Sequence, residues 1–143
     1  MKVYDKLLEF KKKYPMTISW RLKKHAQVIE HHLNPGEKIK YAFVAQKNNN
    51  PFDIITTYAI VLTNKRILLA SKRMLFGYFF TAITPDLFND LTVKMGLVWG
   101  KIIIDSVKEE ITLSNIQREA LDDIETEVTE YMMKEKKKYA QAK

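Results

Sequence analysis

The feature that most constrains the fold is a series of short apolar segments, separated by turn residues, between residues 38 and 113. In the first segment Ile39, Tyr41 and Phe43 alternate with Lys38 and Lys40, which is the period of a half-buried strand. The same reasoning predicts strands at residues 54–62, 66–71, 75–84, 91–95, 98–105 and 108–113. About seven short strands at this spacing favour a small antiparallel barrel or sandwich.

Turn-forming residues separate the predicted strands. Residues 48–51, three asparagines and a proline, predict a loop after the first strand. Residues 63–65 predict the turn of a hairpin between the second and third strands. Pro85 and Asp86 predict a turn of helix that ends near residue 89, and the last two turns are expected at Gly96 and at residues 105–106.

Two amphipathic helices are predicted before the strands. Residues 3–13 place tyrosine, leucine and phenylalanine side chains among lysines. Pro15 ends this helix, because proline disfavours helical geometry in the residue before it. A second helix, from residue 19 or 20 to residue 32, has one apolar face and ends at the Asn-Pro-Gly of residues 34–36.

The last segment of the sequence has the clearest helical pattern. Ser114 followed by Gln117 is typical of a capping box, in which each side chain satisfies a free N–H group. Acidic residues follow this cap, and residues 134–138 are mostly lysine, which is the charge order that a helix dipole favours. One apolar stripe runs along the helix, formed by Ile116, Ala120, Ile124, Val128, Tyr131 and Met132. We expect this stripe to close the open end of the strand barrel.

Seven antiparallel strands followed by one amphipathic helix resemble pleckstrin-homology-like (PH-like) domains. Residues 58–69, Tyr-Ala-Ile-Val-Leu-Thr-Asn-Lys-Arg-Ile-Leu-Leu, are similar to the strand, Thr-Asn-Lys-Arg turn and strand of bacterial PH-like domains. The Asn-Pro-Gly-Glu of residues 34–37 resembles their usual entry to the first strand, and residues 97–105 resemble their penultimate strands. The nearest resemblance is to the YokE-like PH domains of Gram-positive bacteria and their prophages, over about residues 36–135.

This resemblance implies an α+β fold. Residues 37–143 would form a PH-like small antiparallel β-barrel with a C-terminal capping helix, after an N-terminal helical extension in residues 1–36. It also implies a non-catalytic binding module. Eukaryotic PH domains that bind phosphoinositides place basic residues at the end of the first strand and early in the second. Lys47 fits the first role, but residues 53–57 offer no basic residue for the second, so recognition of a protein or peptide is the preferred hypothesis.

Other classes of function lack the residues that they need. The 143 residues include no cysteine, which excludes disulfides, a catalytic thiolate and cysteine-ligated metals. His25, His31 and His32 lack the spacing of a zinc site on one helix, and no serine has the flanking glycines of a nucleophile elbow. We therefore expect no enzyme activity, no cofactor and no metal.

Targeting signals are also missing from the sequence pattern. Residues 1–5 hold no apolar core of a signal peptide. The longest apolar stretch, around residues 74–83, is shorter than the ~20 residues of a membrane-spanning helix. We expect a soluble, cytoplasmic protein.

Basic and apolar segments supply the candidate binding residues. The net charge is +7, and one basic zone would form if the first strand and the hairpin lie side by side, from Lys38, Lys40, Lys65, Arg66, Lys72 and Arg73. Residues 74–80 are apolar on both faces, which fits either a central strand covered by the N-terminal helices or an exposed patch for a partner or a second copy of the chain. The partner is expected to be another protein, with anionic lipid headgroups and then nucleic acid as alternatives. The candidate binding residues are Lys47, Lys65, Arg66, Lys72, Arg73, Phe76 and Tyr78.

Overall fold

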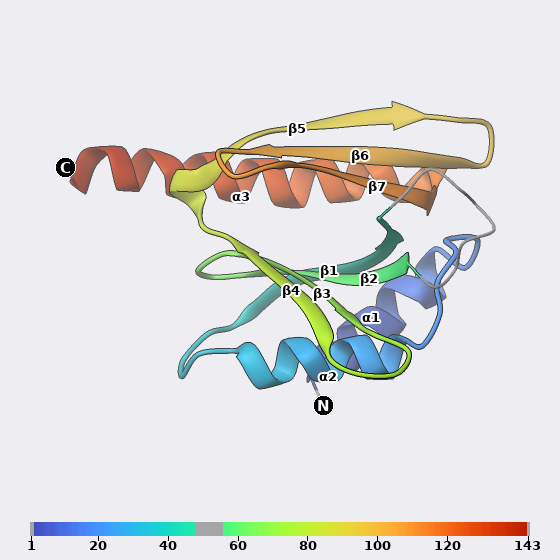
Figure 1. Cartoon of the computed structure of the whole chain (residues 1–143). Coiled ribbons are helices and arrows are strands. Elements are labelled where there is room, and N and C mark those ends of the chain that lie inside the picture. The colour runs from blue at the N-terminus through green and yellow to red at the C-terminus, as the bar shows by residue number, and fades with distance from the viewer. Residues whose placement is uncertain (1, 48–55, 143) are drawn as a thin grey trace.

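The computed structural model of the chain describes residues 2–47 and 56–142, and it contains a seven-stranded antiparallel sheet (Figure 1). The strands lie in the order β4-β3-β2-β1-β7-β6-β5 across the sheet. The helices are α1 (Lys2–Lys13), α2 (Leu22–His32) and α3 (Leu121–Ala142), with short 3-10 turns at η2 (Pro85–Leu87) and η3 (Arg118–Ala120). The strands are β1 (Ile39–Gln46), β2 (Thr57–Thr63), β3 (Ile67–Lys72), β4 (Tyr78–Ile83), β5 (Phe88–Met95), β6 (Trp99–Ser106) and β7 (Glu110–Gln117).

The sheet is divided into two halves that curl toward each other. Strands β1–β4 form one half and β5–β7 the other, and within the described residues the halves join at the pair Gln46 and Ser114. The Ser114 hydroxyl donates to the Gln46 carbonyl oxygen at 3.1 Å, and the Asn115 amide donates to the Gln46 side chain. Because β4 and β5 stand at the two ends of the strand order, the sheet is an open half-barrel. The predicted α+β fold of about seven antiparallel strands and a C-terminal capping helix is confirmed.

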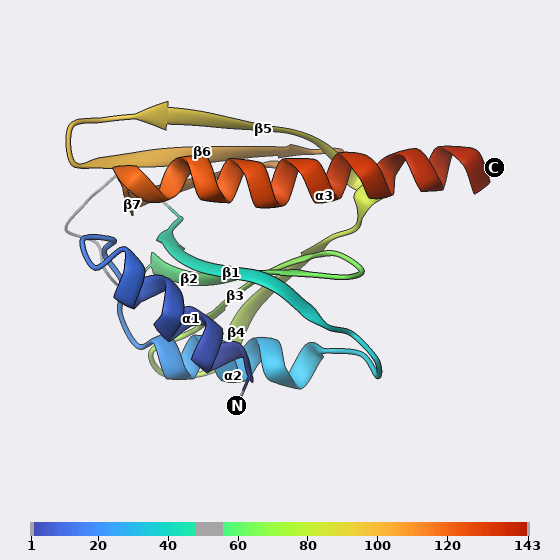
Figure 2. The same ribbon diagram turned by 180° about the vertical axis from the view of Figure 1, so that it is seen from behind.

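Helix α3 covers the inner side of the half-barrel, as Figures 1 and 2 show from opposite directions. It packs mainly on β5 and the η2 turn. Its side chains Ile124, Val128 and Met132 are buried, which confirms this part of the predicted apolar stripe. Ile116 and Ala120 were expected on the same stripe but precede α3, in β7 and η3. Burial of these side chains is worth about 1.5–3 kcal/mol each by transfer free energy, which fixes α3 on the strands.

The predicted capping box is wrong. Ser114 and Gln117 belong to β7, because this strand continues to pair with β6 as far as Gln117, opposite Trp99. The Gln117 side-chain oxygen accepts a hydrogen bond from the Met16 backbone N–H at 2.8 Å instead of capping a helix. Near the other end of α3, the Lys136 ammonium donates a hydrogen bond to the Phe88 backbone carbonyl at the start of β5.

The two N-terminal helices pack on the β1–β4 half of the sheet (Figure 2). Helix α2 lies on β3 and β2, and α1 lies against β1 and α2. The connection between the helices is fastened to β7, where Gln117 N–H donates to the Thr17 hydroxyl at 2.9 Å and Ile18 N–H donates to the Asn115 carbonyl at 3.0 Å. The extension adds apolar side chains to the core, including Val3, Leu7, Phe10, Ala26 and Ile29.

Strand β4 differs most from the sequence prediction. It begins at Tyr78 rather than at residue 75, and it is an edge strand, so the hypothesis of a central strand at residues 75–80 is wrong. Residues 73–77 form a tight turn, in which Arg73 N–H donates to the Gly77 carbonyl at 3.1 Å and Gly77 has a φ of +76°. Strands β2 and β3 are the ones buried on both faces, because α2 covers their outer side.

Some expectations are not tested by the described residues, or are tested only in part. The predicted loop at residues 48–51 and the start of the predicted second strand at residues 54–55 lie outside the described residues. The division into residues 1–36 and 37–143 stays a prediction. Among the described helices, none combines the length and the apolar character that crossing a bilayer requires.

Candidate functional site

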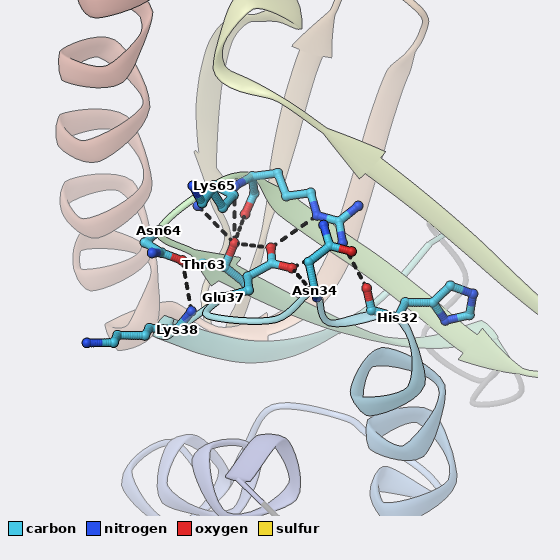
Figure 3. Close-up of polar contacts among 8 residues, drawn as sticks. His32, Asn34, Glu37, Lys38, Thr63, Asn64 and Lys65 are labelled. Atoms are coloured by element: carbon cyan, nitrogen blue, oxygen red, sulfur yellow. Dashed lines mark hydrogen bonds and ion pairs between the residues drawn. The ribbon is translucent and has the colours of Figure 1, made fainter.

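The Thr-Asn-Lys-Arg turn between β2 and β3 is held by the segment that leads into β1 (Figure 3). The Arg66 guanidinium donates two hydrogen bonds of 3.1 Å to the Glu37 carboxylate and one of 2.8 Å to the His32 carbonyl. The Thr63 hydroxyl donates to the same carboxylate at 2.5 Å and accepts from the backbone N–H groups of Lys65 and Arg66 at 3.1 Å each. We call Glu37, Thr63 and Arg66 the clasp. It joins residues 34–37 to the Thr-Asn-Lys-Arg turn, two of the three segments that resemble bacterial PH-like domains.

The clasp commits Arg66 to the fold. The Glu37 side chain is fully enclosed and the Arg66 side chain is 17% exposed. Burial acts to raise the pKa of Glu37, but hydrogen bonds from Arg66, the Asn34 backbone and Thr63 outweigh it and hold this pKa below its usual value. The Lys65 side chain lies exposed at the tip of the same turn.

At the other end of β3, two stacked aromatic rings lie between two cations. The Lys47 ammonium lies 5.5 Å from the centre of the Tyr58 ring. The Tyr58 and Phe79 rings are 6.4 Å apart with 23° between their planes, and the Arg73 guanidinium lies 5.5 Å from the centre of the Phe79 ring. Such contacts hold cations over ring faces. We call these four residues the cation–aromatic row, and it brings together two candidate residues, Lys47 and Arg73, that are distant in sequence.

The turn beside this row exposes three consecutive apolar side chains. Met74, Leu75 and Phe76 are 57%, 83% and 82% exposed. We call these three residues the apolar turn. The apolar turn and the cation–aromatic row together are called the rim surface. Scattered surface hydrophobics are ordinary, whereas contiguous ones mark contact sites. The rim surface is therefore the candidate binding site.

The remaining candidates lie elsewhere. The register pairs Lys72 with Tyr78 and Ser71 with Phe79, so Tyr78 and Phe79 face opposite sides of the sheet. Tyr78 lies on the side of α2, with its ring centre 5.2 Å from that of His32. The hypothesised single basic zone is thus divided, because Lys65 and Arg66 precede β3 and Lys72 and Arg73 lie at its other end.

Comparison with known families agrees with these motifs. A family model described as "Bacterial PH domain" matches residues 33–130, which include the whole clasp and all seven strands. The chain belongs to the bacterial PH domain family. A solved pleckstrin homology domain from Shewanella amazonensis SB2B is 14% identical to it, with a TM-score of 0.42, over 69% of this chain and 76% of that one. The search of curated proteins finds no match. Membership of the YokE-like group stays a prediction.

This bacterial PH domain has a second exposed apolar turn that the sequence analysis did not single out. Leu97 and Val98, between β5 and β6, are 94% and 42% exposed. The neighbouring Trp99 donates its indole N–H to the Met16 carbonyl at 2.7 Å. Figures 1 and 2 place this turn and the β3–β4 turn at the same end of the molecule. The signal was present in the sequence, since apolar residues directly follow the predicted turn at Gly96.

The His25 side chain lies buried between α2 and the end of β3. The buried His25 accepts a hydrogen bond at Nδ1 from the Lys72 backbone N–H at 2.8 Å. Burial lowers the pKa of His25 to about 4, against the effect of a backbone hydrogen bond at Trp20, and the charge of Arg21 adds to the lowering. Within residues 2–47 and 56–142, no three His, Asp or Glu side chains gather in a way that would hold a metal ion.

Proposed function

We propose that this bacterial PH domain is a non-catalytic, cytoplasmic binding module, an adaptor or inhibitor that recognises another protein through the rim surface. One observation carries the proposal: Leu75 and Phe76 are more than four-fifths exposed at the tip of a turn that adjoins the cation–aromatic row. Exposed apolar area costs about 25 cal/mol per Å² relative to burial, and a partner that covers the turn recovers this free energy.

Three features of the rim surface favour a protein as the partner. Methionine, aromatic residues and arginine, which compose most of it, are the residue types enriched in protein interfaces. In the described sheet β4 pairs with β3 alone, so its other edge can pair with an extended segment. Lys47 and Arg73, on a chain of net charge +7, favour an acidic partner.

The test is capture from a cell lysate with the full chain at low and high salt. The wild type is expected to retain a specific protein, and Leu75→Ser/Phe76→Ser is expected to lose it while keeping the wild-type circular dichroism spectrum. Leu97→Ser/Val98→Ser removes apolar exposure from the other turn and serves as the matched control, which is expected to retain the partner. No specific partner at either salt, or equal loss in the control, would contradict the proposal.

Binding to anionic lipid headgroups is the second candidate function. Both apolar turns lie at one end of the molecule, and the β3–β4 turn has Lys47, Lys72 and Arg73 around it. Apolar side chains among cations suit the interface of an anionic bilayer. Co-sedimentation with phosphatidylglycerol vesicles at low salt tests this function. Pelleting that both double serine variants lose supports it, and no pelleting of the wild type removes it.

Nucleic acid and a second copy of the chain are the remaining alternatives. Stacking on single-stranded bases needs exposed aromatic rings among cations, which Phe79 and Arg73 provide. The absence of a gel shift at low salt removes nucleic acid. A second copy would pair along the free edge of β4. Light scattering measures the mass and decides this point.

A further inference from the structure

A hollow lies on the outer face of the sheet, between α2 and the end of the β3–β4 hairpin. Its volume is about 380 Å³, within the range of small-molecule sites. We call it the α2 pocket. Its polar lining consists of Lys24, Gln27, His31, His32, Lys72 and Tyr78.

Contacts on both sides hold the walls of the α2 pocket in place. The His32 ring stacks on Phe80 at 4.0 Å with 15° between the planes, and its Nδ1 donates to the Val28 carbonyl at 2.7 Å. Figure 3 shows this ring pointing away from the clasp. The hydrogen bond of 2.8 Å between Lys72 N–H and His25 fastens the end of β3 to α2. The pocket is therefore pre-organised.

The pocket carries an excess of positive charge. Lys24 reaches it from α2 and Lys72 from β3, and no Asp or Glu is among the described residues that line it. Within the described ranges neither lysine forms an ion pair. The Gln27 amide and the Tyr78 hydroxyl add neutral donors. Two ammonium groups with neutral donors suit a dianionic group that offers several acceptor oxygens, which is the chemistry of a phosphate.

We propose that the α2 pocket binds a phosphate monoester, with the phosphate between Lys24 and Lys72. The volume exceeds that of a phosphate group, and the half-exposed Tyr78 ring gives the organic part of the ester an apolar wall. Helix α2 precedes residue 33, where the match to the bacterial PH domain family begins, so the site needs the N-terminal extension and is not a site of the shared strands alone. The rim surface lies on the other face of β4 and is not involved.

Nuclear magnetic resonance titration of the full chain with inorganic phosphate and with phenyl phosphate tests this site. Saturable shifts are expected for the backbone amides of α2 and of the end of β3, with phenyl phosphate binding more tightly. The Lys24→Gln/Lys72→Gln variant is expected to weaken binding about tenfold or more, since charge-assisted hydrogen bonds are lost. Lys23→Gln/Lys65→Gln removes the same charge from exposed lysines outside the pocket and is expected to keep the wild-type affinity.

Vesicles distinguish a soluble ester from a lipid headgroup. Saturable binding of phenyl phosphate supports a soluble ester. Sedimentation with phosphatidic acid but not phosphatidylcholine, lost in Lys24→Gln/Lys72→Gln, supports a headgroup. The proposal would be overturned if the two lysine double variants bound phenyl phosphate with equal affinity, or if the amide shifts were confined to other surfaces. It would also be overturned if the wild type bound none of these probes. Leu75→Ser/Phe76→Ser is expected to keep phosphate binding, so this site and the rim surface fail or succeed separately.

Discussion

Burial of His25 makes the stability of the protein depend on pH. The folded-state pKa is lowered to about 4, whereas an unfolded histidine titrates near 6.5. The unfolded state therefore binds more protons between these values, and stability is complete above pH 6.5 and falls as the pH decreases toward 4. We expect His25 to account for a loss of about 2 kcal/mol in the free energy of unfolding between pH 7 and pH 5.

Urea denaturation at both pH values measures this loss. His25→Asn keeps a side-chain acceptor for the Lys72 N–H but does not titrate in this range. Between pH 7 and pH 5, the unfolding free energy of the variant is therefore expected to fall by about 2 kcal/mol less than that of the wild type. Equal pH dependence in the wild type and in His25→Asn would show that His25 is not buried as a neutral ring.

The clasp predicts a second effect at the scale of one residue. Glu37→Gln leaves the Arg66 charge without its carboxylate in a largely enclosed place, and we expect a loss of about 3 kcal/mol in unfolding free energy. Glu9→Gln, at an exposed glutamate paired with Lys6, is the matched control and is expected to change stability by less than about 0.5 kcal/mol. A cost for Glu37→Gln as small as that of the control would show that the clasp does not stabilise the fold.

The carboxylate of Glu37 also makes stability depend on pH, but here hydrogen bonds lower the pKa and burial acts against them. The pKa of Glu37 is lowered in the folded state, so its contribution is present above the unfolded pKa and disappears as the pH falls through the folded one. The Glu37→Gln variant is therefore expected to lose less stability than the wild type on acidification below about pH 4.5.

Packing of α3 on β6 gives a prediction at the scale of elements. A Cβ at Gly100 would lie 2.4 Å from the Leu121 Cδ1 atom and 2.7 Å from the Lys94 carbonyl oxygen. Gly100→Ala is expected to cost about 2 kcal/mol, because the start of α3 and the β5 backbone must both move. Thr92→Ala, at an exposed position of β5, is the control, and thermal unfolding compares the two. A neutral Gly100→Ala would contradict this close approach.

Periodicity was enough to predict the elements, but not how far each one continues. The apolar stripe of α3 and the alternation in β1 are local signals, so the sequence predicts that both elements exist. The helix start was misplaced because Ser114 and Gln117 have the spacing of a cap, and only pairing with Gln46 and Trp99 shows that β7 continues. Likewise, the apolar run at residues 74–80 reads as a central strand until the strand order places β4 at the edge.

At the scale of the whole molecule, the charge of the rim surface is expected to steer its partner. Lys47→Gln/Arg73→Gln removes both cations of the row, and we expect the association rate with the captured protein to fall about tenfold at low salt. Lys38→Gln/Lys65→Gln changes the net charge equally at the opposite end of β3 and is the control. Stopped-flow mixing at two salt concentrations measures both rates, and equal slowing would assign the effect to net charge alone.

The candidate sites depend on contacts between distant segments, which limits what the sequence can predict. The fold family followed from residues 34–37 and 63–66 because each motif is contiguous. Neither the stacking of Phe79 on Tyr58 nor the presence of Lys24 and Lys72 in the lining of one pocket has a local sequence pattern. The charge of Arg66 makes it a candidate binding residue in the sequence, and only the structure shows that its guanidinium is paired with Glu37.

Hydrogen exchange of the full chain, with and without the protein retained in the capture experiment, tests the binding role of the rim surface most directly. We expect the partner to slow exchange in residues 73–79 and along the free edge of β4, and to leave the turn at residues 63–66 unchanged. Slower exchange confined to the turn at residues 63–66 or to α3, with residues 73–79 unaffected, would contradict it.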